Sequence, residues 1–193
     1  MGKTLRGPIR RRHAPSPSPR PASVASSFVL ETYRVDGDVA RRYWALPGRI
    51  LVGGRILSVD DADGLRRKYG ITHVLSAESE QSDEATWLDP ATRARFPFPD
   101  DEQAIPIGLC VSAIAHARSV LAQPDAVLYC HCRLGGSRGP TFGYTALRVL
   151  GRTPEEAHDQ CGRRKIYSTG LHPAYVRSIE GALLVTDIQF VRS

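Results

Sequence analysis

The sequence predicts an α/β fold in which a short, central, mostly parallel sheet is flanked by helices and followed by a helical C-terminal part. Two observations predict this fold class. Short apolar, β-branched runs alternate with helical patterns early in the chain, and only helical patterns follow residue 140. In addition, 193 residues are enough for one domain with a well-buried core and too few for two ordinary domains.

Turn and capping signals separate the expected elements. Pro47-Gly48 divides two strands and Gly70 ends the first helix, while Thr153-Pro154-Glu155-Glu156 combines a helix cap, a first-turn proline and a capping-box glutamate. Strands are expected at Tyr43–Leu46, Arg49–Val52, Ile71–Leu75 and Ala126–Tyr129, with a further strand ended by Phe96-Pro97-Phe98. Helices are expected at Asp60–Tyr69, Ile114–Leu121, Thr141–Leu150, Thr153–Gly162 and Pro173–Leu184.

Residues 1–27 form a tail of different composition, and we assign the folded domain to residues 28–193. The tail is rich in Pro, Ser and Arg and has almost no large apolar residue, a composition typical of disorder. It carries six of the 26 basic residues and no acid, so the remainder has 26 − 6 = 20 bases against 20 acids. The net charge of +6 therefore belongs to the tail, and the neutral domain lacks the basic stripe that nucleic acid requires.

Three interpretations of the tail remain open: a flexible extension or misassigned start, an organelle transit peptide, or a docking arm for anionic partners such as nucleic acid. No stretch approaches the roughly 18 apolar residues of a membrane span, and the N-terminus lacks a secretory apolar run. We therefore expect a cytoplasmic protein, or an organellar one if the tail is a transit peptide. In that setting we expect free thiols at its four cysteines, which are Cys110, Cys130, Cys132 and Cys161.

The segment that carries the chemistry follows the strand at residues 126–129 and leads into a helix. It reads Cys-His-Cys-Arg-Leu-Gly-Gly-Ser-Arg-Gly-Pro-Thr over residues 130–141. A strand, a loop of small residues and a helix start together supply inward-pointing backbone amides and a positive helix end, which are the groups that bind phosphate. Gly135 and Gly136 allow the backbone angles and close approach that such a loop requires.

Cys132 and Arg138 are the candidate nucleophile and phosphate clamp of this loop. A free thiol with a pKa of about 8.5 is only about 3% thiolate at pH 7, and a helix N-terminus with a nearby cation favours the thiolate. Arg138 lies six residues after Cys132 and offers a planar fork of donors to two phosphate oxygens. The spacing alone is common by chance, and His131, the glycine at the third loop position and the flanking strand and helix make it specific.

A general acid is also needed, because an alkoxide or phenoxide leaves slowly unless it is protonated. Asp100 and Asp101 follow Phe96-Pro97-Phe98-Pro99, on a loop after a predicted strand and 32 residues before Cys132 in the case of Asp100. From the residues alone, Asp100 and its alternative Asp101 both remain candidates for the acid.

These motifs resemble the dual-specificity branch of the protein tyrosine phosphatase superfamily, whose signature is His-Cys, two residues, Gly, two residues, Arg, and then Ser or Thr. The resemblance runs from about residue 47 to residue 184 and includes the Pro47–Gly54 segment PGRILVGG. It implies a protein tyrosine phosphatase-like fold, a phosphocysteine at Cys132 and Asp100 acting first as acid and then as base, without metal or cofactor. It also implies a phosphate site formed by Arg133, Leu134, Gly135, Gly136, Ser137 and Arg138, with His131 orienting the loop.

One residue departs from that signature. Gly139 stands where the family has a Ser or Thr whose hydroxyl stabilises the departing thiolate when the intermediate is hydrolysed. We therefore expect a slow second step. Thr141 is a candidate substitute for the hydroxyl, although a residue at a helix start more commonly serves as a local cap.

Other functions compete with an active phosphatase. A phosphate-binding pseudophosphatase would explain Gly139, and a rhodanese-like sulfurtransferase also uses a cysteine loop, although a shorter one. A metal site at residues 130–132 lacks a second Cys or His pair at zinc spacing. Cys130 is either a core thiol or a redox partner of Cys132.

The substrate is predicted only by class. The loop has no lysine of the kind found in phosphoinositide-selective relatives, so a phosphorylated protein is the expected substrate, with RNA 5′-phosphates and lipids as alternatives. Arg163, Arg164 and Lys165 are either a basic patch beside the cleft that receives acidic substrates or a solvated turn.

Overall fold

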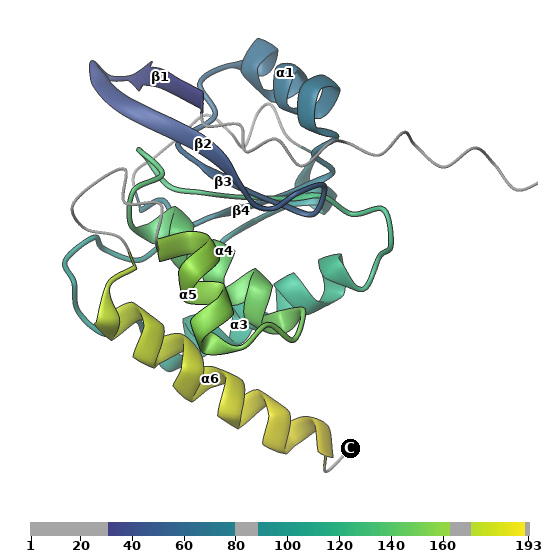
Figure 1. Ribbon diagram of the computed structural model, residues 1–193, viewed down its shortest axis with the longest axis vertical. Coiled ribbons are helices and arrows are strands. Elements are labelled where there is room, and N and C mark those ends of the chain that lie inside the picture. The colour runs from purple at the N-terminus through teal and green to yellow at the C-terminus, as the bar shows by residue number, and fades with distance from the viewer. Residues whose placement is uncertain (1–30, 80–88, 163–170, 192–193) are drawn as a thin grey trace, which may run out of the picture.

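The computed structural model describes residues 31–79, 89–162 and 171–191, and the tail and the basic residues 163–165 lie outside these ranges. A six-stranded sheet of order β1-β2-β3-β6-β4-β5 forms its centre (Figure 1). The strands β1, β2 and β3 pair antiparallel, whereas β3, β6, β4 and β5 run parallel, which confirms the predicted fold class. The strands are β1 (Glu31–Val35), β2 (Asp38–Leu46), β3 (Ile50–Gly53), β4 (His73–Ser76), β5 (Arg93–Arg95) and β6 (Leu128–His131).

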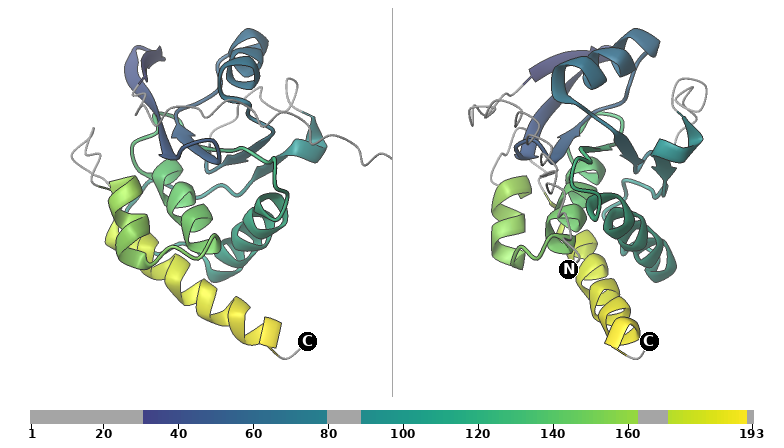
Figure 2. Two further views of the ribbon diagram at one scale, coloured as in Figure 1. Left: turned by 45° about the vertical axis from the view of Figure 1, so that its right-hand side comes forward. Right: turned by 90° about the vertical axis from the view of Figure 1, so that its right-hand side faces the viewer.

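Helices cover both faces of the sheet. The helix α1 lies on one face, and α3, α4, α5 and α6 lie together on the other, with α6 extending beyond the rest (Figures 1 and 2). No helix in the described part of the chain combines the length and the apolar character that a bilayer span requires. The helices are α1 (Val59–Tyr69), α3 (Ile107–Leu121), α4 (Arg138–Val149), α5 (Pro154–Gly162) and α6 (Pro173–Val191), with a short 3-10 helix η1 (Pro90–Thr92).

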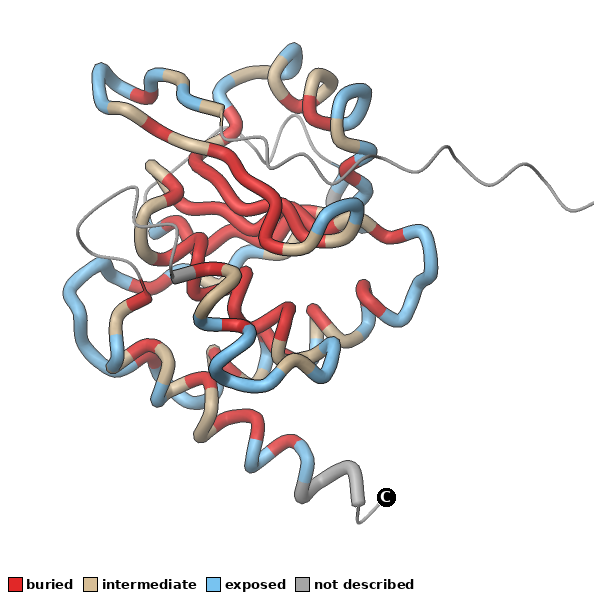
Figure 3. Tube along the Cα trace, viewed as in Figure 1, coloured by how far each residue is buried: buried red, intermediate tan, exposed pale blue. Residues whose placement is uncertain are grey.

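Alternate side chains of the central strands enter two separate cores. In β3, Ile50 and Val52 join the core beneath α3, α4 and α6, whereas Leu51 joins the core beneath α1. In β6, Tyr129 faces α1 and Cys130 faces the larger core. Buried positions are therefore concentrated along the middle strands (Figure 3), as the period-2 geometry of a sheet covered on both faces requires.

Several boundary signals act as the sequence predicts. Gly70 ends α1 in the left-handed conformation, with φ of 69°. At the start of α5, the Thr153 hydroxyl accepts from the Glu156 N–H at 3.2 Å, and the Glu156 carboxylate accepts from the Thr153 N–H at 2.9 Å. This reciprocal pair is the predicted capping box.

Other boundaries differ from the prediction. The helix α3 begins at Ile107 rather than Ile114, directly after Pro106, because small residues in its first turns obscure the helical apolar period. Strand β6 starts at Leu128 and continues through His131, so the histidine belongs to the strand. Strand β5 ends at Arg95, before the Phe-Pro-Phe segment.

The hairpin formed by β1 and β2 was not predicted. Its turn is Asp36-Gly37, with φ of 51° and 87°, the left-handed conformation that a tight two-residue hairpin turn requires. An Asp-Gly pair between β-forming segments is the strongest short-range hairpin signal, and it was available in the sequence. The hairpin lies beside the loop described below.

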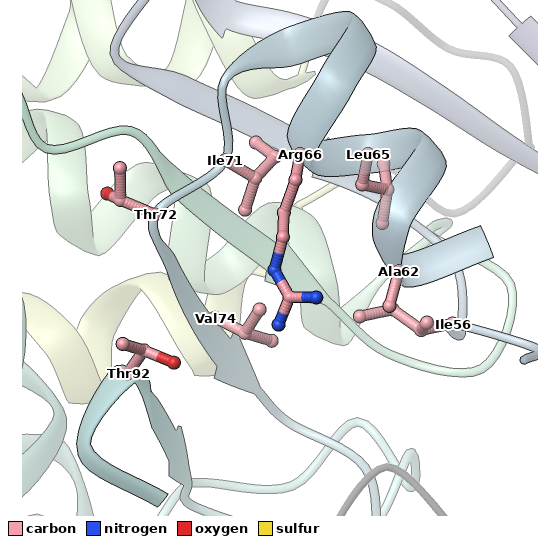
Figure 4. A pocket seen from close by; sticks show the side chains of 8 residues that line it. All are labelled: Ile56, Ala62, Leu65, Arg66, Ile71, Thr72, Val74 and Thr92. Carbon is pink, nitrogen blue, oxygen red and sulfur yellow. The ribbon is translucent and has the colours of Figure 1, made fainter. Parts of the chain in front are cut away.

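A small recess opens between α1 and β4, and Figure 4 shows the Arg66 side chain extending across it. It has room for no more than about one water molecule. None of its lining residues belongs to the segment 130–141. The residues that line the recess are Ile56, Ala62, Leu65, Arg66, Ile71, Thr72, Val74 and Thr92.

Close packing of α4 on β3 makes a specific stability prediction at Gly143. A Cβ there would lie 2.5 Å from the Val52 Cγ2 and 3.1 Å from the Cys161 Sγ, both in the core. We expect Gly143→Ala to destabilise the fold by roughly 1–3 kcal/mol, despite the better helix propensity of alanine. Urea unfolding measures the change.

Gly64→Ala is the matched control. Gly64 lies in α1, and its added Cβ would meet nothing within 4 Å. The control should stabilise the protein by up to about 1 kcal/mol. Equal effects of the two substitutions would contradict the close approach of α4 to β3.

Candidate active site

The candidate active-site residues gather at one edge of the sheet. Strands β3, β6, β4 and β5 run parallel, so their carboxyl ends meet at that edge. Cys132 follows β6, Ser79 lies shortly after β4, and Asp100 and Asp101 follow β5. The topology thus explains how residues 32 apart in sequence reach one site.

Carbonyl groups of the loop from Cys132 to Ser137 accept hydrogen bonds from two nearby backbone segments of the protein. The Arg133 carbonyl accepts from the Arg55 N–H at 3.0 Å, and the Leu134 carbonyl accepts from the Arg41 N–H at 3.3 Å. In a planar trans peptide, the N–H of the next residue points opposite to the carbonyl. The amides of residues 134 and 135 therefore point away from the strands, toward the space that the loop surrounds.

Gly135 makes the close approach to those strands possible. Its φ is 77°, and a Cβ would lie 2.5 Å from the Gly53 carbonyl carbon and 2.9 Å from the Arg41 carbonyl oxygen. No side chain fits there without displacing backbone. Gly136, predicted to need similar freedom, does not have a positive φ.

The helix α4 begins at Arg138 and presents its amino end to the loop. Ser137 occupies the cap position, but its side chain makes no capping hydrogen bond. The Ser137 hydroxyl therefore does not cap these amides, and the helix dipole adds positive potential there. Cys132, only 3% exposed, lies at the opposite end of the same loop. This arrangement favours the binding of an anion at the loop.

Hydrogen bonds to two other segments fix the Arg138 side chain, in addition to its place at the start of α4. Its Nη1 donates to the Phe98 carbonyl at 3.1 Å and to the Ser79 hydroxyl at 3.0 Å. Its side chain is 4% exposed, and its Nε lies 3.6 Å from a carboxylate oxygen of Asp100. A guanidinium anchored in this way keeps its orientation at little further entropic cost when it binds an anion.

The structure separates the two candidate acids. Asp100 faces Arg138, whereas the Asp101 carboxylate accepts from the Gln103 N–H at 3.0 Å within its own turn. The Tyr175 hydroxyl, from α6, lies 3.5 Å from the other Asp100 oxygen. The Asp100 carboxylate is therefore the one that lies beside Arg138.

His131 lies behind the loop rather than in it. Its ring is fully buried and stacks on Tyr129 with centroids 5.4 Å apart, and its carbonyl accepts from the Ala77 N–H at 2.8 Å. Tyr129 in turn donates to the Gly54 carbonyl and accepts from the Arg42 Nε at 3.2 Å. These contacts fix the strand end from which Cys132 emerges.

The other cysteines lie in the core. Complete burial raises the pKa of Cys130 well above its ordinary value, and the neighbouring Cys161 acts in the same direction. Burial also raises the pKa of Cys110 to about 11. All four cysteines are free thiols. Cys130 and Cys110 are therefore thiols, not thiolates, at neutral pH, and a redox partnership of Cys130 with Cys132 remains a hypothesis.

Gly139 packs closely against the backbone at the ends of β3 and β6. A Cβ there would lie 3.1 Å from the Gly53 carbonyl oxygen and 3.2 Å from the Cys132 nitrogen. A side chain would thus require the strand end or the helix start to move by a few tenths of an ångström. The Thr141 hydroxyl donates to the Ser137 carbonyl at 3.1 Å, which is a local helix-start contact.

Three features of the site were missed in the sequence. The hairpin turn contributes Asp36 and Asp38, whose carboxylates lie 3.3 and 3.0 Å from the Arg133 guanidinium. Arg55 forms an ion pair with the fully buried Glu78. Tyr175, which lies in α6, contacts Asp100 in the loop after β5. The Asp-Gly turn signals the hairpin, whereas no local pattern marks Arg55 or Tyr175.

Within the described residues, no three His, Cys, Asp or Glu side chains gather in a way that could hold a metal ion. The groups that face the candidate site are a thiol, a guanidinium, a carboxylate and backbone amides. Groups of these kinds can bind and transfer a phosphoryl group.

Solved structures with the same architecture are cysteine-based phosphatases. PTPMT1 is 17% identical with a TM-score of 0.57, over 76% of this chain and 96% of that chain; it has also been solved in complex with PI(5)P. Human DUSP28 is 15% identical with a TM-score of 0.55, over 76% and 95% of the two chains. TpbA of P. aeruginosa is 18% identical with a TM-score of 0.53, over 75% and 89%.

No family model and no curated protein matches this sequence. The match to this chain nevertheless extends over almost the whole length of PTPMT1 and of DUSP28. At these identities the likeness concerns the fold, and the chain has the fold of the cysteine-based protein tyrosine phosphatase and dual-specificity phosphatase superfamily.

Proposed function

We propose that this chain is a phosphatase that hydrolyses phosphomonoesters through a phosphocysteine at Cys132. The single observation that supports it most is the contact of Arg138 with Asp100. A buried guanidinium from the start of α4 and a carboxylate from the loop after β5 lie 3.6 Å apart, at the edge where Cys132 follows β6. This proximity supports the proposal, because Arg138, Asp100 and Cys132 come from three segments to the same edge of the sheet.

The proposed reaction has two steps. The Cys132 thiolate attacks phosphorus, the S–P bond forms, and the bond to the leaving oxygen breaks as Asp100 donates its proton to that oxygen. Asp100, now a carboxylate, then takes a proton from a water molecule that attacks the phosphocysteine. The S–P bond breaks, which releases phosphate and restores the thiolate. The amides of residues 133–138 and the Arg138 guanidinium bind the phosphoryl oxygens in both steps.

Hydrolysis of an aryl phosphate with EDTA present tests this proposal. Wild type should turn over, Cys132→Ser should show no activity, and Asp100→Ala should lose about 100-fold together with the basic limb of the pH profile. Asp101→Ala is the matched control, because that carboxylate bonds within its own turn. It should keep the basic limb.

Two results would contradict this assignment. Loss of the basic limb in Asp101→Ala alone would make Asp101 the acid. Phosphate binding that depends on Arg138, without any turnover by wild type, would favour the pseudophosphatase.

Gly139 predicts that hydrolysis of the phosphocysteine limits the rate. We expect a rapid-quench burst of about one leaving group per enzyme, followed by slower turnover. Gly139→Ser should reduce the burst, because the hydroxyl can stabilise the departing thiolate. Gly139→Ala adds the same Cβ, at 3.1 Å from the Gly53 carbonyl, without a hydroxyl. Fast wild-type turnover without a burst would contradict the prediction.

A phosphorylated protein is the substrate class that we propose, and the charges near Arg133 support it. Arg133 is paired with Asp36 and Asp38, and Arg55 is paired with Asp36 and Glu78. These two cations beside the loop are thus partly neutralised. A phosphoinositide headgroup carries additional negative charge, and the carboxylates would repel it. The complex of PTPMT1 with PI(5)P makes a lipid the second candidate.

Substrate preference should therefore depend on the hairpin carboxylates. We expect wild type to prefer a phosphotyrosine peptide to a short-chain phosphatidylinositol phosphate, by kcat/KM. Asp36→Asn/Asp38→Asn should shift this ratio toward the lipid by about 2- to 10-fold, as expected for partly exposed ion pairs.

Asp63→Asn/Asp187→Asn is the matched control. It removes the same charge from two surface ion pairs, Asp63 with Arg66 and Asp187 with Arg118. The control should leave the ratio unchanged. Better hydrolysis of the lipid than of the peptide by wild type would reverse the assignment.

A further inference from the structure

The loop of residues 98–105 carries Asp100 and is called the acid loop here. Hydrogen bonds anchor both of its ends. Upstream, the Phe98 carbonyl accepts from Arg138 at 3.1 Å, and downstream, the Ile105 N–H donates to the Ser178 hydroxyl of α6 at 3.0 Å. Asp100 lies between these two anchors. Its position therefore depends on what holds the middle of the loop, residues 99–102.

One buried side chain, that of Tyr175, makes several contacts there. The Tyr175 hydroxyl accepts from the Glu102 N–H at 2.9 Å, and lies 3.3 Å from the Pro99 carbonyl and 3.5 Å from Asp100. A phenol has one proton and two lone pairs, so it can accept from Glu102 and donate to Pro99 or Asp100. One hydroxyl thus connects both sides of the turn that carries Asp100.

The turn has a backbone that requires such support. Glu102 has φ of 63°, a left-handed conformation that is unfavourable for a residue with a side chain. The Tyr175 hydroxyl satisfies the amide of this same residue. Without that acceptor the turn would lose the contact that stabilises its strained conformation, and Asp100 is two residues away.

The tyrosine itself is well fixed. It is fully buried, and its ring packs edge-on against Phe98 with centroids 5.2 Å apart. Burial raises its pKa above the ordinary value, so the hydroxyl is protonated at neutral pH and available as a donor. The ring and the hydroxyl therefore contact two parts of the same loop.

We propose that Tyr175 is a positioning residue for the general acid: its hydroxyl holds residues 99–102 so that Asp100 stays beside Arg138. This inference rests on the proposed function and adds a role for α6 in it. Tyr175 acts through Asp100 and touches no reacting atom.

Tyr175→Phe tests the proposal, because it keeps the ring and removes only the hydroxyl. General acid catalysis matters most for a poor leaving group. We expect kcat/KM for phenyl phosphate to fall about 10-fold, with a flattened basic limb. For an activated substrate such as a fluorinated methylumbelliferyl phosphate, we expect a change of less than about twofold.

Tyr144→Phe is the matched control. Tyr144 is also buried, and its hydroxyl donates to the Glu180 carboxylate at 2.7 Å. Glu180 lies in α6 but outside the acid loop. It should affect the two substrates equally. In the Asp100→Ala background, Tyr175→Phe should have little further effect on phenyl phosphate, because the acid through which it acts is absent.

Equal losses on both substrates, or full additivity with Asp100→Ala, would overturn the positioning role and leave the proposed function intact. Hydrogen exchange of residues 99–105 provides a readout that needs no turnover, and Tyr175→Phe should accelerate it. Unchanged exchange would also overturn the role. A wild-type protein without turnover overturns the proposed function instead, and the positioning of an acid with it.

Discussion

The direction of two peptide groups determines what the candidate site can do. The Arg133 and Leu134 carbonyls are bound by the Arg55 and Arg41 amides, so the next N–H groups in the loop point into the space that it surrounds. Gly135 permits this because a side chain there would overlap the backbone of Gly53. Contacts within the protein thus orient the amides of residues 134 and 135.

The rest of the fold supports this loop from two directions. Parallel pairing of β3, β6 and β4 fixes the strand end before Cys132, and the stacking of His131 on Tyr129 fills the space behind it. On the other side, Arg138 reaches back to Phe98 and joins the start of α4 to the loop that carries Asp100. Arg138 and Asp100 are therefore connected by these contacts, and Cys132 follows the strand end that the sheet fixes.

The sequence predicted the parts of this arrangement that depend on neighbouring residues. The segment from His131 to Arg138 is contiguous between a strand and a helix, so the sequence could predict its placement, and Asp100 and Asp101 became candidate acids from their place after a strand. The sequence could not predict that Tyr175 contacts the acid loop, because a tyrosine in an amphipathic helix is most often a core residue. The β1–β2 hairpin was missed although Asp36-Gly37 marks it, since exposed polar residues on those strands weaken the apolar alternation.

The most direct test of the central claim is to identify the phosphorylated residue. Wild-type protein would be mixed with an aryl phosphate, quenched in acid within the first turnover, digested and sequenced by mass spectrometry. The account predicts one phosphoryl group on Cys132, and none on Cys130 in the same peptide. Turnover with no phosphoryl group on Cys132, or with the group on His131, would contradict it.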